Sequence, residues 1–219
     1  MKSVEKLNAI CILLLKLVYV NALWLLCTLC GGVIFGVGPA TYAAVSVCRQ
    51  WVRGKDVPVA PTFWQYVKEG FREATAMSLL YMFAGTVLIV DLLFVTQWYV
   101  KGLLFLLLFA YGLSLLFIFP VMANYDVKGM FFKIKTAFWI GLSFLQYSLV
   151  TSLIIAVFFG LFWTIFPGIL VFLGASLPLF LLAWMGNQVF TRMEALHHNE
   201  TKQSKRGKHN EQTHDLKIG

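Results

Sequence analysis

The sequence predicts an all-α membrane protein: a polytopic transmembrane helical bundle with five full spans, one short half-helix and one amphipathic helix at the cytoplasmic interface. Hydrophobic residues make up 59% of the 219 residues and charged residues only 13%, whereas a soluble domain carries about 25% charged residues. The apolar residues occur in runs longer than a globular core helix requires. We expect residues 1–196 to form one transmembrane helical domain and residues 197–219 to form a disordered, basic, histidine-containing cytoplasmic tail.

The full spans are predicted from the long apolar runs, since about 20 apolar residues cross the hydrocarbon core of a bilayer. The first run is too long for the core of a signal peptide and is expected to be retained. Pro178 is expected to bend the last span. The five expected spans are Leu7–Cys30, Ala74–Gln97, Gly102–Ala123, Phe138–Trp163 and Ile169–Phe190.

A glycine- and proline-rich stretch, residues 31–49, is expected to be the centre of the fold. It is apolar, yet it carries residues that weaken a helix or begin a new one. We expect a helix end near Gly31, a turn at membrane depth, and a second helix from Pro39 to about Arg53. At about 1.5 Å per residue this second helix is too short to cross a core of about 30 Å. The residues of this candidate functional break are Gly36, Gly38, Pro39 and Thr41.

The start of the half-helix, at Ala40 and Thr41, has two interpretations. Its free N–H groups and positive dipole end could receive an anionic or hydroxyl-rich ligand. A neighbouring side chain such as Asn21 could equally cap it.

Basic residues are concentrated on one side of the predicted membrane. The net charge is +8, and most lysines and arginines lie in short loops beside hydrophobic runs, which disfavours nucleic-acid binding. The positive-inside rule then places both termini and both long loops in the cytoplasm. Both termini are inside only if the half-helix returns the chain to the cytoplasm. The alternative is an external N-terminus, which Lys2 and Lys6 disfavour.

The segment Thr62–Glu73 is predicted to form an amphipathic helix, begun by a capping box between Thr62 and Gln65. Its apolar positions recur at helical spacing. It could lie at the lipid interface or dock against a partner protein. The candidate partner contacts are Phe63, Trp64, Lys68, Phe71 and Lys133.

The candidate intramembrane polar residues within the predicted spans are Lys16, Asn21 and Asp91. Lys16 could reach the interface with its long stem or face the bundle interior and pair with freed carbonyls. Asp91 could couple transport to an ion, or could be an interfacial residue with a local partner. Lys16 and Asp91 are expected at different depths and are not expected to pair.

The sequence lacks the motifs of common enzyme classes. It has no phosphate-binding Gly-Lys-Ser/Thr loop, no Gly-x-Ser-x-Gly and no His-Glu-x-x-His. Cys27 and Cys30 lie within an apolar helix and are expected to act as small hydrophobes, and the four histidines all lie in the tail. We therefore expect no enzymatic activity, no cofactor and no metal.

Five stretches within residues 8–190 form a recognisable combination: 21–24, 36–41, 49–53, 63–74 and 119–125. Together they resemble the YesL family of small integral membrane proteins, found mostly in Gram-positive bacteria. Members of that family accompany oligosaccharide ABC importers and polysaccharide-degrading enzymes.

The resemblance implies an accessory membrane protein of carbohydrate uptake that assembles, in the lipid bilayer, with permease or ATPase subunits of a sugar ABC importer. The alternative is a small autonomous transporter or channel in which the Gly31–Pro39 break lines the path. A third possibility is a regulatory protein that signals through its tail.

Overall fold

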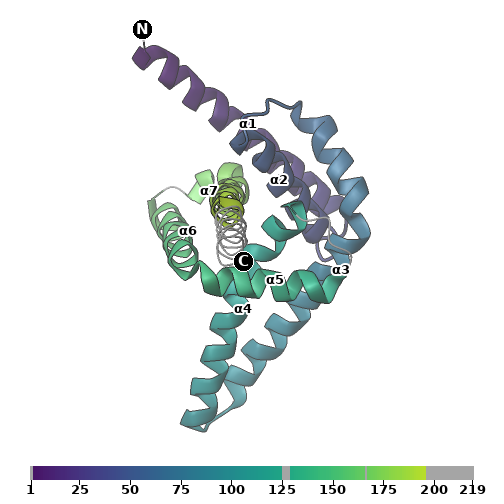
Figure 1. The fold of residues 1–219 in the computed structure, drawn as a ribbon, viewed down its shortest axis with the longest axis vertical. Helices are drawn as coiled ribbons and strands as arrows, with labels where there is room; N and C mark the ends of the chain where they lie inside the picture. The colour runs from purple at the N-terminus through teal and green to yellow at the C-terminus, as the bar shows by residue number, and fades with distance from the viewer. Residues whose placement is uncertain (1, 125–128, 166, 196–219) are drawn as a thin grey trace, which may run out of the picture.

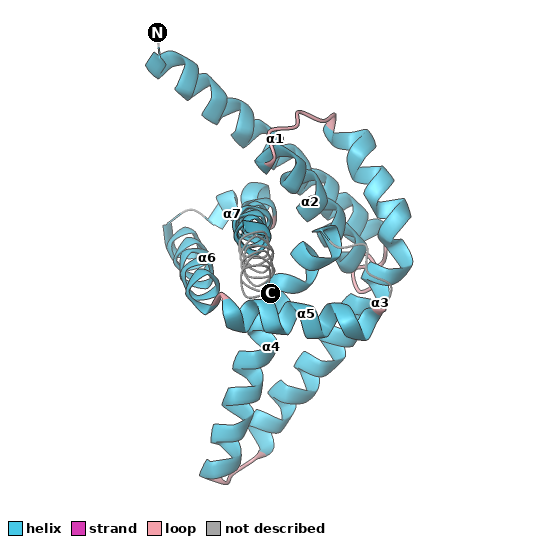
Figure 2. Ribbon diagram, viewed as in Figure 1, coloured by secondary structure: helices cyan, strands magenta, loops and turns pink. Residues whose placement is uncertain are grey.

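The computed structural model describes residues 2–124, 129–165 and 167–195, and all regular secondary structure in these ranges is helical (Figure 2). Residues 176–195 form a last helical segment, which we call the C-terminal helix. The other helices are α1 (Lys2–Cys30), α2 (Val37–Val52), α3 (Val59–Phe94), α4 (Trp98–Asn124), α5 (Met130–Ser143), α6 (Leu145–Ile165) and α7 (Pro167–Leu173) (Figure 1).

Within the described residues, four helices are long and apolar enough to cross a membrane, rather than the five expected. They are Val4–Cys30, Val59–Phe94, Trp98–Asn124 and Leu145–Thr164. The all-α class is therefore confirmed, with four candidate membrane spans, but the two C-terminal spans differ from the prediction.

The expected span Phe138–Trp163 is two helices. Helix α5 ends at Ser143, Phe144 has non-helical angles (φ −114°, ψ 39°), and α6 begins at Leu145. The Ser148 hydroxyl lies 3.4 Å from the Gly141 carbonyl oxygen and 3.5 Å from the Phe144 carbonyl oxygen. It can therefore donate a hydrogen bond to a carbonyl that the end of α5 leaves free. In Figure 1, α5 runs across α4 while α6 turns away from it.

The expected span Ile169–Phe190 is also interrupted, at Gly174 and Ala175, where α7 ends and the C-terminal helix follows. The prediction of a bend at Pro178 is wrong. Pro178 lies in the first turn of the C-terminal helix, where a missing N–H costs no intrahelical hydrogen bond.

Helix α2 is the centre of the molecule, as expected. It packs against α1, α3 and α4, and ten of its 16 residues are buried. Many of these residues are small, including Ala40, Ala43 and Ala44, which are fully buried. Small side chains allow neighbouring helices to approach closely, as in membrane helix packing generally.

Helix α3 is continuous from Val59 to Phe94, so the segment Thr62–Glu73 is not a separate helix. The predicted capping box is wrong: the N-cap is Pro58, Thr62 lies inside the helix, and the Gln65 amide donates to Glu69. Helix α3 packs against α2, but only part of its apolar face is buried, because Trp64 and Phe71 are exposed. Its buried residues in this half are Phe63, Val67, Gly70 and Ala74.

Two parts of the chain project from this central body in opposite directions (Figure 1). One is the hairpin formed by the second half of α3 and the first half of α4. Its helices are joined by a 3.0 Å hydrogen bond from the Tyr111 hydroxyl to the Tyr81 carbonyl, and Tyr81 also bonds to Ser114. The other is the N-terminal half of α1, whose residues 4–12 are all exposed.

Candidate functional site

The predicted break between α1 and α2 is confirmed, and the structure shows how α1 ends. The N–H of Gly32 bonds to the Leu29 carbonyl at 3.0 Å, and the N–H of Val33 bonds to the Thr28 carbonyl at 2.8 Å. Gly32 has φ +66°. This pair of hydrogen bonds with a left-handed glycine is a Schellman motif, which satisfies carbonyls left free at a helix end. A helix break in an apolar environment requires such hydrogen bonds, because no water is present to bind the free backbone groups.

Helix α2 then runs back along α1. The Trp24 indole donates to the Thr41 hydroxyl at 3.1 Å, near the turn. At the other end, the Lys16 ammonium lies 5.7 Å from the centre of the Trp51 ring. The chain therefore doubles back at residues 31–36, as the sequence predicted.

Gly36 and Gly38 are covered by protein backbone. A Cβ added at Gly36 would lie 2.6 Å from the Thr28 carbonyl oxygen, and one added at Gly38 would lie 2.4 Å from the Ala74 carbonyl oxygen. Pro39 is buried beside them. These residues therefore allow close helix packing, and they leave no open space at their own positions.

A cavity of about 460 Å³ lies beside the break. It is bordered by Trp24 and Thr41 from the hairpin and by Phe159, Leu170 and Pro178 from the C-terminal half. The Thr41 hydroxyl already accepts the Trp24 hydrogen bond. Because the lining is mostly apolar, the cavity suits an apolar or aromatic group better than an anion.

Asn21 does not cap α2. Its amide oxygen accepts hydrogen bonds of 3.2 Å from the N–H groups of Ala175 and Ser176, and its amide nitrogen donates to the Val171 carbonyl at 2.7 Å. Asn21 is only 3% exposed. It therefore caps the C-terminal helix from α1 and satisfies a carbonyl of α7 at the same time.

Lys16 and Asp91 do not pair with each other, as expected. The Lys16 ammonium is 2.7 Å from the Asp56 carboxylate in the loop after α2. This partner agrees with the interfacial interpretation of Lys16, since Asp56 lies in a polar, exposed loop. Asp91 is exposed near the tip of the α3–α4 hairpin. No salt bridge of Asp91 occurs among the described residues.

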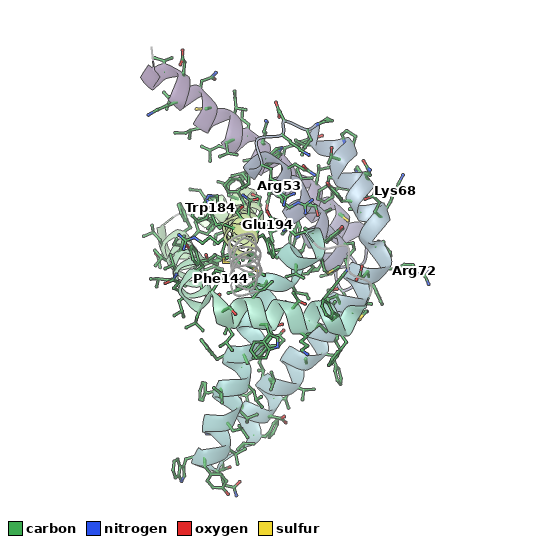
Figure 3. The ribbon with its side chains drawn as sticks, viewed as in Figure 1. Arg53, Lys68, Arg72, Phe144, Trp184 and Glu194 are labelled. Carbon is green, nitrogen blue, oxygen red and sulfur yellow. The ribbon has the colours of Figure 1, made fainter. Side chains whose placement is uncertain are left out.

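The candidate partner contacts divide into two groups. Phe63 is fully buried, and Lys133 is 4% exposed with its ammonium 2.5 Å from the Glu73 carboxylate. These two residues therefore hold α3 against α2 and α5. Trp64, Lys68 and Phe71 are exposed, and Figure 3 shows Lys68 and Arg72 pointing away from the body.

Sequence reasoning missed a polar cluster at the end of α2. Arg53 donates to the side-chain oxygens of Asn124 (2.9 Å) and Asn187 (3.3 Å). One turn earlier, burial and the Arg53 charge lower the pKa of the Arg49 guanidinium. The spacing of Arg49 and Arg53 is visible in the sequence, but no pattern connects them with Asn124 or Asn187.

No group of three or more potential metal ligands occurs within residues 2–124, 129–165 and 167–195. The four histidines and the expected disordered tail lie outside these ranges. Cys27 and Cys30 are free thiols, the first buried and the second exposed.

Comparison with known proteins identifies a family and several relatives of this chain. The family described as "Protein of unknown function, DUF624" matches residues 17–92, which include the second half of α1, all of α2 and nearly all of α3. Uncharacterized protein YteU of Bacillus subtilis (strain 168) is 31% identical over 182 residues, which cover 80% of this chain and 81% of YteU. The chain belongs to the YesL-like DUF624 family.

Two further Bacillus subtilis proteins match. Uncharacterized protein YesL is 34% identical over 128 residues, 56% of this chain and 60% of YesL. Uncharacterized protein YesV is 29% identical over 215 residues, 89% of this chain and 96% of YesV. No solved structure matches this YesL-like chain.

Proposed function

We propose that this YesL-like protein is an accessory membrane protein of carbohydrate uptake that assembles with a sugar ABC importer. The observation that carries the proposal is the outer face of the first half of α3. It combines exposed aromatic residues, Trp64 and Phe71, with exposed cations, Lys68 and Arg72. Aromatic and arginine side chains are enriched where proteins meet.

The position of this outer face supports a docking role. The opposite face of the helix is fixed on α2 through Phe63 and Val67, so the exposed residues stand on a rigid support. Helix α3 continues without a break to Phe94. A partner bound near Trp64 would therefore contact the same helix that forms one half of the α3–α4 hairpin.

We place the protein in the plasma membrane with both termini cytoplasmic, on the basis of the distribution of basic residues.

Co-purification in mild detergent tests the proposal. The tagged protein is recovered from its native bacterium grown on different oligosaccharides, and importer subunits are quantified by mass spectrometry. We expect permease or ATPase subunits with the wild type. The variant Trp64→Ala/Phe71→Ala should recover at least about tenfold less importer, since truncating an aromatic hot-spot residue costs roughly 2 kcal/mol or more of binding free energy.

The matched control is Phe94→Ala/Trp98→Ala, which removes two exposed aromatic side chains at the hairpin tip. This control should recover as much importer as the wild type. Recovery of the wild type without importer subunits on every sugar, or an equal loss in both double variants, would count against the proposal.

The alternative proposal is a small autonomous transporter, and the cavity beside Trp24 and Thr41 is the observation that favours it. Purified protein in liposomes distinguishes the two. Sugar or ion flux without any partner, reduced by Lys16→Met or Asp91→Asn, supports the autonomous transporter. Absence of flux together with recovery of importer subunits supports the accessory role.

A further inference from the structure

The C-terminal end of α2 carries two arginines one helical turn apart. Arg49 lies in the last turn, and Arg53 is the C-cap residue. The salt bridges within the described residues are Lys16–Asp56 and Lys133–Glu73. Neither Arg49 nor Arg53 therefore has a carboxylate partner in that part of the chain.

Arg53 is held in place by neutral groups from two other elements. Its Nη2 donates to Asn124 at the end of α4, and its Nε donates to Asn187 in the C-terminal helix. The Asn124 amide nitrogen in turn donates to the Pro120 carbonyl at 2.8 Å, which fixes the orientation of this amide. A guanidinium has five N–H donors. The two amide bonds leave three donors for another acceptor.

Arg49 is more enclosed and has fewer partners. Its Nε atom is buried and has no hydrogen-bond partner among the described residues. Its guanidinium has Tyr66 as a hydrogen-bond partner and is near Arg53 and Tyr42, and none of these three residues is a carboxylate. A partly buried cation beside a second cation is unfavourable without a counter-charge.

Helix dipoles supply only part of this counter-charge. Arg49 and Arg53 lie at the end of α2, and Arg53 also bonds to the last residue of α4. Each helix C-terminus carries about −0.5 charge. Two such ends offset about one of the two positive charges, so a positive charge of about one remains.

We infer that Arg49 and Arg53 form a binding site for a phosphate group, with Asn124 and Asn187 orienting Arg53. The planar guanidinium matches the geometry of phosphate oxygens and binds them through paired N–H···O bonds. The phosphate could belong to the headgroup of an anionic phospholipid or to a soluble phosphate. Basic pockets between membrane helices commonly bind such headgroups.

The test uses the full-length protein in nanodiscs. The wild-type protein is placed in nanodiscs of phosphatidylcholine alone or of phosphatidylcholine with phosphatidylglycerol. Its thermal unfolding temperature is measured in each, and the lipid that stays bound is identified by native mass spectrometry. Inorganic phosphate and glucose 6-phosphate are added to the phosphatidylcholine discs at constant ionic strength. A specific response to phosphatidylglycerol assigns the site to a lipid headgroup, whereas a response to either soluble compound assigns it to a soluble phosphate.

The variants are Arg49→Gln and Arg53→Gln, with Lys101→Gln as the matched control for lost charge at the other end of α4. We expect each arginine variant to bind the phosphate at least about tenfold more weakly, since a hydrogen bond to a charged group contributes roughly 1.5–3 kcal/mol. Lys101→Gln should bind as the wild type does. No response of the wild type to any of the three probes, or equal binding by wild type and both arginine variants, overturns the inference.

A conservative variant keeps the test valid if the glutamine variants do not fold. Arg53→Lys retains the positive charge but loses the planar fork of donors. We expect its affinity to fall at least about threefold relative to the wild type, because two parallel hydrogen bonds are replaced by a point charge. Affinity equal to that of the wild type overturns the assignment of Arg53.

Discussion

The Asn21 side chain donates a 2.7 Å hydrogen bond to the carbonyl of Val171, 150 positions away in the sequence. The same amide accepts the N–H groups of Ala175 and Ser176, so one buried side chain joins the end of α7 to the start of the C-terminal helix. Backbone groups at a chain break in an apolar environment need such partners. This contact therefore explains how the last expected span is interrupted at Gly174.

We predict that Asn21→Ala destabilises the protein by about 3 kcal/mol, because it leaves two N–H groups and one carbonyl without partners. Thermal unfolding in detergent measures the effect. Asn8→Ala is the matched control, because Asn8 lies exposed on the same helix, and it should change stability by less than about 0.5 kcal/mol. Equal stability of the two variants would show that the Asn21 contacts do not hold the break.

The sequence was sufficient to predict the α1–α2 hairpin. The break after Cys30 depends on local signals, namely Gly32 with its left-handed backbone and Pro39 in the first turn of α2. Glycine permits a positive φ and proline fixes φ at their own positions, so their effect can be predicted without knowing distant contacts. The antiparallel return of α2 followed from the short turn and from the basic residues after it.

The breaks in the second half could not be predicted in the same way. Phe144 has no unusual sequence signal, and α6 and α5 together look like one apolar run. The interruption at Gly174 depends on Asn21, which lies in a distant part of the sequence. Likewise, the apolar face of Thr62–Glu73 predicted an interfacial helix, because the pattern alone does not distinguish lipid from the surface of α2.

Gly38 is predicted to be intolerant of any side chain. A Cβ there would lie 2.4 Å from both the Ala74 carbonyl oxygen and the Ser78 hydroxyl oxygen. Gly38→Ala should therefore force α2 away from α3 and cost about 1–3 kcal/mol, as overpacking commonly does. The measurement is thermal unfolding together with near-UV circular dichroism.

The matched control for Gly38 is Gly112→Ala in α4, where nothing lies within 4 Å of the added Cβ. Because alanine favours a helix over glycine, this variant should be more stable by about 0.5–1 kcal/mol. A neutral or stabilising Gly38→Ala would contradict the close packing of α2 on α3.

The two ion pairs are predicted to contribute differently to stability. The Lys133 side chain is 5% exposed and pairs with Glu73, whereas Lys16 pairs with Asp56, whose side chain is 83% exposed. Glu73→Gln leaves a buried ammonium without its counter-ion and should destabilise the protein by about 2 kcal/mol or more. Asp56→Asn breaks an exposed pair and should cost less than about 1 kcal/mol.

The double variant Glu73→Gln/Lys133→Met separates the ion pair from the packing around it. Removing both charges avoids the unpaired buried ammonium, so this variant should regain part of the stability lost in Glu73→Gln. Chemical denaturation in detergent gives the free energy of unfolding of the wild type, of Glu73→Gln and of the double variant. A double variant no more stable than Glu73→Gln would show that the loss arises from packing rather than from the lone charge.

Thiol labelling is predicted to divide the four cysteines into two pairs. Cys11 and Cys30 are exposed, whereas Cys27 is 5% exposed and Cys48 is fully buried in α2. In detergent, where no bilayer covers the surface, a maleimide should therefore modify Cys11 and Cys30 quickly, and Cys27 and Cys48 only after unfolding. Peptide mass spectrometry at several times of reaction identifies each site. Rapid modification of Cys48 in the folded protein would mean that α2 opens from its neighbours, and the close packing of the α1–α2 hairpin against α3 would then be incorrect.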